Sequence, residues 1–161
     1  MAEIQLRDVI ASDLPVFFRN QLDADANHMA AFTAKDPADR DAFDHHWAKI
    51  IADSSIPIQT ITLGNEVIGH VLSYELAGAT EVSYWISKEY WGRGLATQAM
   101  RAFLQLQTVR PLHARAAKDN IASLRVLEKC GFVITGVDRG YANARGAEIE
   151  EFVLQLNAAR A

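Results

Sequence analysis

The residue types that could bind an anion are concentrated in one stretch, Trp91-Gly92-Arg93-Gly94-Leu95-Ala96. Its small residues let the backbone turn tightly and approach a ligand closely. A helical pattern begins at Leu95, so the N–H groups of this stretch lack intrahelical acceptors and lie at the positive end of a helix. Together these groups predict an anion site suited to phosphate.

Two other interpretations of the stretch are open. Gly92 and Gly94 could serve only a tight connection between a strand and a helix. A dinucleotide-binding Gly-x-Gly-x-x-Gly motif is the second alternative. Against it, the third glycine position, counted from Gly92, is Thr97, and the stretch lies mid-chain rather than in a first βαβ unit.

The elements that must position this stretch are a strand before it and a helix after it. Residues 82–87 are rich in β-branched and aromatic side chains, which is typical of a strand. The apolar residues after the stretch recur at helical spacing and predict one face of a helix that ends near Gln107: Leu95, Ala99, Phe103 and Leu106.

The first part of the chain predicts a short strand and two helices. Ile4 and Leu6 alternate with polar residues, and a helix opens at Ser12-Asp13-Leu14-Pro15 and runs to about Gln21. Residues 23–32 fit either a loop or a short helix. Asp36 is the expected N-cap of the next helix, whose predicted buried face is Phe43, Trp47, Ile50 and Ile51.

Strands flank the central segment on both sides. Residues 56–63 and 66–74 are strand-like and are joined by Gly64-Asn65, a hairpin signal. Residues 112–117 fit another strand. Residues 132–137 and 148–156 fit a closing pair.

The last predicted helix begins between residues 119 and 123. Asn120 is its expected cap and Gly131 its expected stop. Its predicted apolar face is Ile121, Leu124, Leu127 and Cys130 or Gly131.

Composition limits the classes of protein. A chain of 161 residues, half of them hydrophobic, predicts a single domain. A net charge of −4 argues against a broad electrostatic contact with nucleic acid and suits a cationic amine better. No segment is apolar enough to cross a bilayer, which predicts no membrane partner and a cytoplasmic protein.

Cysteine and histidine give no metal signal. Cys130 is the only cysteine, which excludes an internal disulfide and a Cys-rich zinc site, and it is expected to be a small buried apolar residue. His45 and His46 are adjacent and therefore point to different sides of a helix, and no partner pattern accompanies them or His28. We therefore expect no metal.

Two motifs together resemble the GCN5-related N-acetyltransferases, particularly the branch that acetylates ribosomal-protein N-termini. The first is residues 91–96, and the second is Asn120-x-x-Ser123 with Glu128-Lys129-Cys130-Gly131-Phe132. The order of the elements over nearly the whole chain also fits. The resemblance implies an α/β fold with a mixed, mostly antiparallel sheet, a splayed parallel strand pair and about four flanking helices.

The resemblance also implies acetyl-CoA as cosubstrate. The first motif would hold the pyrophosphate, and Asn120 would contact the pantetheine arm, which would pair with free backbone groups of the central strand. The cofactor-binding residues implied in this way are Trp85, Ile86, Ser87, Trp91, Gly92, Arg93, Gly94, Leu95, Ala96, Thr97, Asn120 and Ser123.

One departure from the family pattern concerns the general acid. The family often has a tyrosine seven residues after the motif asparagine, and Leu127 occupies that position. Water, Ser87 or Tyr84 could replace it. A second departure is Trp91, where many members have glutamine or arginine, although the branch named above commonly has tryptophan.

Glu81 is the expected general base, because it would lie with Tyr84 along the strand that leads into the splay. A solvated strand residue or a cross-strand ion pair is the alternative role for Glu81. His28, Phe32 and Tyr74 are the expected substrate-side residues.

The sequence therefore predicts an acetyl-CoA-dependent N-acetyltransferase that acts on a primary amine, either a protein N-terminus or a small molecule, as a monomer or a homodimer. The alternative is a non-catalytic acyl-CoA sensor on the same fold, which the missing tyrosine leaves open.

Overall fold

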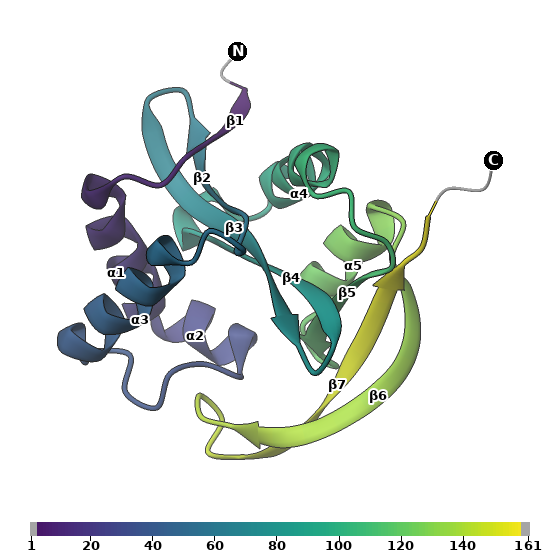
Figure 1. Ribbon diagram of the computed structural model, residues 1–161. Helices are drawn as coiled ribbons and strands as arrows, with labels where there is room; N and C mark the ends of the chain where they lie inside the picture. Colours follow the sequence, from purple (N-terminus) through teal and green to yellow (C-terminus); the bar gives the residue numbers. More distant parts are fainter. Residues whose placement is uncertain (1–2, 159–161) are drawn as a thin grey trace.

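The computed structural model describes residues 3–158 and contains one seven-stranded sheet in the order β1-β2-β3-β4-β5-β7-β6 (Figure 1). Every neighbouring pair is antiparallel except β4 and β5, which are parallel. The strands are β1 (Ile4–Arg7), β2 (Ile58–Leu63), β3 (Glu66–Leu76), β4 (Ala79–Ile86), β5 (Leu112–Ala117), β6 (Val133–Ala142) and β7 (Ala147–Leu156). A mostly antiparallel sheet is not the doubly wound parallel sheet of a dinucleotide-binding fold, so that alternative is wrong.

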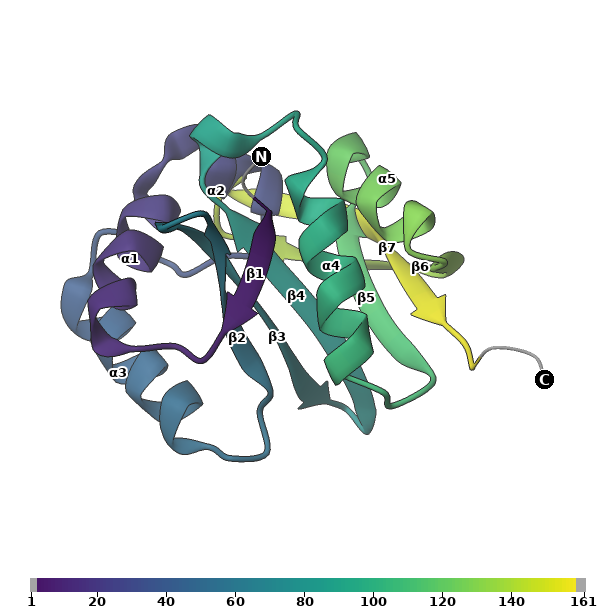
Figure 2. The same ribbon diagram turned by 90° about the horizontal axis from the view of Figure 1, so that it is seen from above.

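The described residues form five α-helices and two 3₁₀ turns: η1 (Ala11–Asp13), α1 (Leu14–Leu22), α2 (Ala24–Ala30), α3 (Arg40–Ala52), η2 (Lys88–Tyr90), α4 (Leu95–Leu106) and α5 (Ile121–Lys129). Figure 2 shows α4 and α5 side by side next to β4, β5 and β7, with α1 and α3 grouped near β2. The segment that fitted either a loop or a short helix is α2. No helix among residues 3–158 is long and apolar enough to cross a membrane.

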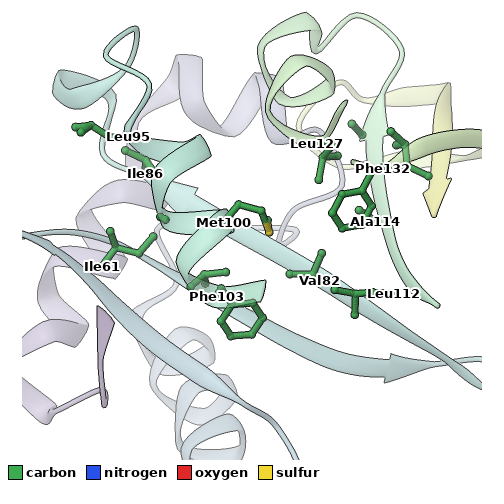
Figure 3. Close-up of a cluster of buried hydrophobic side chains, with 14 of the residues drawn as sticks. Ile61, Val82, Ile86, Leu95, Met100, Phe103, Leu112, Ala114, Leu127 and Phe132 are labelled. Atoms are coloured by element: carbon green, nitrogen blue, oxygen red, sulfur yellow. The ribbon is translucent and has the colours of Figure 1, made fainter. Parts of the chain in front are cut away.

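Side chains of successive strand residues divide between two packed layers. On β3, Val71 belongs to the large core under α4 and α5, whereas His70 stacks against Phe17 of α1 and Trp47 of α3. Figure 3 shows Met100 and Phe103 of α4 in the large core with Val82 of β4. The sheet therefore has helices on both faces, and β4 lies between the two layers.

Three apolar residues that were predicted to lie on the apolar faces of helices, Leu106, Ile51 and Ile121, are exposed. Leu106 is the last residue of α4 and is 61% exposed, while Met100 is buried in its place. Ile51 follows buried Ile50 by one residue, about 100° around the helix, and is exposed. Ile121 is the first residue of α5 and is also exposed, whereas Leu124 and Leu127 are buried as expected.

The start of α3 also differs from the prediction. The helix begins at Arg40, and Asp39 is its N-cap because its side chain accepts the N–H of Ala42. Asp36 instead forms a turn, in which its carboxylate accepts the N–H of Ala38. Asp36 and Asp39 can both cap a helix and lie three positions apart. Asp36 forms the turn before α3, and Asp39 caps the helix itself.

The hairpin predicted at Gly64-Asn65 is confirmed, since β2 and β3 pair antiparallel on either side of it. Gly69 of β3 lies opposite Ile86 of β4, and a Cβ at Gly69 would come 1.9 Å from the carbonyl oxygen of Trp85. Gly69 therefore allows β3 to hold the end of β4 closely.

Gly69→Ala is expected to lower the free energy of unfolding by about 1–3 kcal/mol, because the backbone of β3 or β4 must move to make room for the added methyl group. Urea denaturation measures this loss. Gly136→Ala is the control, since a Cβ there meets no atom within 4 Å. Equal stability of the two variants would contradict the close approach of β3 and β4.

Candidate functional site

The segment between β4 and α4, here called the glycine loop (residues 91–97), has an open anion-binding geometry. Gly92 and Gly94 have φ of 78° and 73°, which is left-handed backbone that favours glycine. A Cβ at either glycine would meet no protein atom within 4 Å. The loop therefore has room beside its backbone, and its glycines are needed for conformation.

The N–H groups of residues 92–97 have no acceptor among the described residues. The amides on either side are used: Trp91 N–H donates to Lys88 O and Gln98 N–H donates to Gly94 O. Within the described residues no side chain caps α4, which is 12 residues long. Six free donors at the positive end of a helix have the chemistry to bind a phosphate-like anion.

The side chain of Trp91 holds the glycine loop over the end of β4. Its Nε1–H donates to the carbonyl of Ile86 at 2.8 Å. Next to it, the guanidinium of Arg93 lies 5.5 Å from the centre of the Tyr90 ring. The loop is thus fixed to the strand that leads into it.

The strands β4 and β5 separate after one register pair, Glu81 with His113. On its other side β4 stays paired with β3, and the N–H of Ser87 donates to the carbonyl of Ile68. Hydrogen-bonding direction alternates along a strand, so Trp85 also faces β3, while the backbone of Tyr84 and Ile86 faces the gap toward β5. The free N–H groups in this gap come from alternate residues only.

The Asn120 side chain uses both its oxygen and its nitrogen within the protein. Its oxygen accepts the N–H of Ser123 at 3.2 Å and caps α5, and its Nδ2 donates to the carbonyl of Met29 in α2. The structure also brings Tyr84 to Ser123, since the phenol donates to the Ser123 hydroxyl at 3.2 Å. Burial raises the pKa of Tyr84, which keeps it protonated at neutral pH.

Leu127 is only 2% exposed and lies in the core between α4 and α5. Ser87 is also buried, and its hydroxyl donates to Oδ1 of Asn20 at 2.7 Å. Among the hydroxyl groups considered as replacements for the family tyrosine, both Ser87 and Tyr84 are therefore already hydrogen-bonded as donors.

Glu81 lies in a charged group that sequence reasoning missed, here called the Arg115 cluster (Glu81, Arg115, Asp138 and Glu151). The Arg115 Nε donates to Glu81 at 3.1 Å, and its Nη1 donates to Asp138 at 2.7 Å and to Glu151 at 2.9 Å. Glu81 is 3% exposed, and its second oxygen, Oε2, is buried without a donor. The cross-strand ion pair weighed for Glu81 is thus present, and one buried carboxylate oxygen has no hydrogen-bond donor among the described residues.

The Arg115 cluster lies on the sheet face opposite α4 and α5. Glu81 alternates along β4 with Val82, which is in the large core under those helices. The pKa of Arg115 is raised, first by its bond to Asp138 and then by its bond to Glu151. Arg115 is therefore permanently charged, and it connects β4 to β5, β6 and β7 beside the gap.

The three residues expected to contact the substrate lie in different parts of the fold. Tyr74 lies opposite Glu81 in the β3–β4 pairing, and burial followed by the charge of Glu81 raises its pKa. Phe32 is 38% exposed and lies beside Gly140 of β6. His28 is exposed on α2, where its backbone carbonyl accepts a hydrogen bond from Nε of Arg145. No hydrogen bond within residues 3–158 connects His28 to Glu81.

The described part of the chain brings together no group of three or more metal-ligating side chains that could hold an ion.

Arg115→Gln should lower stability at pH 7 by on the order of 2 kcal/mol, because it leaves the buried Glu81 carboxylate unpaired. The loss should shrink as the pH falls. Arg115 holds the pKa of Asp138 below its ordinary 3.8, so this pairing stabilises the fold above that value and ceases to do so as Asp138 protonates.

Urea denaturation at pH 7 and near pH 3 measures this difference. Arg139→Gln is the control, since Arg139 pairs with Glu148 where both side chains are 63% exposed, and such pairs contribute little. An equal loss of stability at pH 7 and near pH 3 would show that the charges of the Arg115 cluster do not contribute to stability.

Three comparisons relate this geometry to known proteins. The model of the acetyltransferase (GNAT) domain family matches residues 3–133. The L-methionine sulfoximine/L-methionine sulfone acetyltransferase of Pseudomonas aeruginosa is 26% identical over 94% of this chain and 93% of that protein. The uncharacterized N-acetyltransferase p20 of Bacillus licheniformis is 27% identical but aligns over only 49% of this chain and 47% of that protein.

One solved structure has a fold similar to that of this chain. Mycobacterium smegmatis RimJ in complex with CoA-disulfide superposes with a TM-score of 0.79 at 22% identity, covering 96% of this chain and 82% of that one.

Proposed function

We propose that this chain, which belongs to the GNAT acetyltransferase family, transfers the acetyl group of acetyl-CoA to a primary amine. The six free N–H groups of the glycine loop carry this proposal, because donors without acceptors at the positive end of α4 suit a phosphate. Membership of the GNAT family makes the chain an N-acetyltransferase. The proposal therefore concerns the cosubstrate, the roles of individual residues and the acceptor amine.

Residues of three segments fit the parts of acetyl-CoA. The glycine loop would hold the pyrophosphate, and the backbone of Ile86 and Tyr84 would pair with the amides of the pantetheine arm. Ser123 is in the first turn of α5 and Asn120 is the N-cap of that helix, and Asn120 would exchange its bond to Met29 for one to that arm. When bound, acetyl-CoA supplies a thioester carbonyl carbon, which the amine attacks as the C–S bond breaks.

We propose Glu81 as the group that removes a proton from the acceptor. An amine at neutral pH is mostly protonated and must lose one proton before it can attack. The free Oε2 of Glu81, directly or through one water, would take that proton on the sheet face opposite α4 and α5.

Tyr84 is the favoured donor to the leaving thiolate. It faces α5 from the other side of β4, burial raises its pKa and keeps it protonated, and its hydroxyl would exchange its bond to Ser123 for one to the thiolate. Base and acid would therefore act from opposite faces of the same strand. Trp85 and Ser87, whose backbone is directed to β3, would support the strand and contact the cosubstrate less directly.

One observation favours a second candidate, an acyl-CoA sensor. Leu127 is buried where the family often has a tyrosine, so a member without turnover is chemically reasonable.

The two candidates differ in CoA release from acetyl-CoA. The enzyme is expected to release CoA above the no-amine rate with at least one acceptor from a panel of diamines, monoamines, L-methionine sulfoximine and peptides with free N-termini. Thiol detection measures this directly. A protein that binds acetyl-CoA and releases no CoA with any acceptor would be the sensor.

Glu81→Gln should lower kcat by about 10²–10⁴-fold, because glutamine keeps the shape of the side chain but has no basicity. The dissociation constant of acetyl-CoA should stay nearly unchanged, and the acidic limb of the pH–rate profile should move or disappear. Stopped assays on the best acceptor and a binding titration test both parts. Turnover near the wild-type rate with the same pH profile would make Glu81 a structural residue.

A further inference from the structure

The Arg115 cluster has more negative charge than its one guanidinium can balance. Glu81, Asp138 and Glu151 contribute three carboxylates, and Arg115 contributes one positive charge. We propose that the acceptor is a small dicationic amine, with the reacting ammonium at Glu81 and a second ammonium at Glu151 and Asp138. This inference rests on the proposed function and names its substrate class.

Other described residues do not remove this excess charge. Arg139 follows Asp138 but points to the opposite face of β6, where it pairs with Glu148, and only its backbone N–H bonds to Asp138. Lys118 pairs with Glu150, which likewise alternates with Glu151 along β7. The cluster therefore keeps two uncompensated negative charges on the face where Tyr74 lies.

Two carboxylate oxygens in the cluster have no donor among residues 3–158. Oε2 of Glu81 is buried and unpaired, which is costly for a charged oxygen unless a ligand or water donates to it. Glu151 is 12% exposed, and only one of its oxygens accepts from Arg115. An ammonium group offers three donors and a positive charge, so it can satisfy both the hydrogen bond and the charge.

The shared guanidinium limits the distance between the two proposed ammonium sites. Glu81 and Glu151 both bond to Arg115, at 3.1 and 2.9 Å. Two such bonds to one guanidinium keep the two bonded carboxylate oxygens within roughly 8 Å of each other. An extended four-carbon diamine fits within this limit, whereas a carboxylate at its far end would be repelled by Glu151 and Asp138.

Three acceptors that share one amine and one chain length isolate the far-end charge: 1,4-diaminobutane, n-butylamine and 4-aminobutanoate. We expect kcat/KM to fall in that order, with steps of about three- to fivefold, the range of a partly exposed ion pair. Rising salt concentration should narrow the differences. CoA release with saturating acetyl-CoA measures all three.

Asp138→Asn should lower the ratio of kcat/KM for the diamine to that for butylamine by about threefold. Glu151→Gln should lower the same ratio and serves as a second variant. Asp41→Asn, an equal charge change on the exposed surface of α3, should leave the ratio unchanged.

The outcomes separate the two levels of the proposal. Turnover of butylamine or 4-aminobutanoate at or above the rate of the diamine would overturn the dicationic acceptor and leave the acetyltransferase standing. An unchanged ratio in both Asp138→Asn and Glu151→Gln would do the same, as would turnover of peptides without turnover of the diamine. Acetyl-CoA binding without CoA release from any acceptor would overturn the proposed function and this inference together.

Discussion

The separation of β4 from β5 is the constraint on which the rest of the site depends. β4 is fixed to β3 by eight register pairs, and β5 is fixed to β7 by six, yet the two parallel strands share only one. Neither strand can close the gap without breaking an antiparallel pairing, so backbone donors of β4 stay free inside a folded sheet. The glycine loop follows at the end of that strand, and Trp91 fixes it there.

Charge is divided between the two sides of the gap. The amides of the glycine loop and the α4 dipole make its open end attractive to phosphates, whereas the Arg115 cluster makes the opposite face attractive to cations. An anionic cosubstrate and a cationic acceptor would therefore approach from different directions and meet at β4. Such positioning can supply a large part of the rate of acyl transfer.

Local signals in the sequence predicted most of the elements. Gly64-Asn65 indicated a hairpin and Asn120 a helix cap, because both effects act within a few residues, and the structure confirms them. The Arg115 cluster could not be predicted in this way, since it depends on the register of four strands that are distant in sequence. The exposure of Ile51 and Leu106 also depends on where each helix meets the sheet.

The central claim, that the glycine loop binds the pyrophosphate of acetyl-CoA, is tested most directly by calorimetric titration of acetyl-CoA into wild type, Gly94→Val and Gly146→Val. Both glycines have positive φ, 73° and 62°, and open space beside them, so the two variants carry similar backbone strain. The account predicts that Gly94→Val, folded by circular dichroism, loses most of its acetyl-CoA affinity while Gly146→Val keeps it. Equal affinity in the two folded variants would place the phosphates elsewhere and contradict the account.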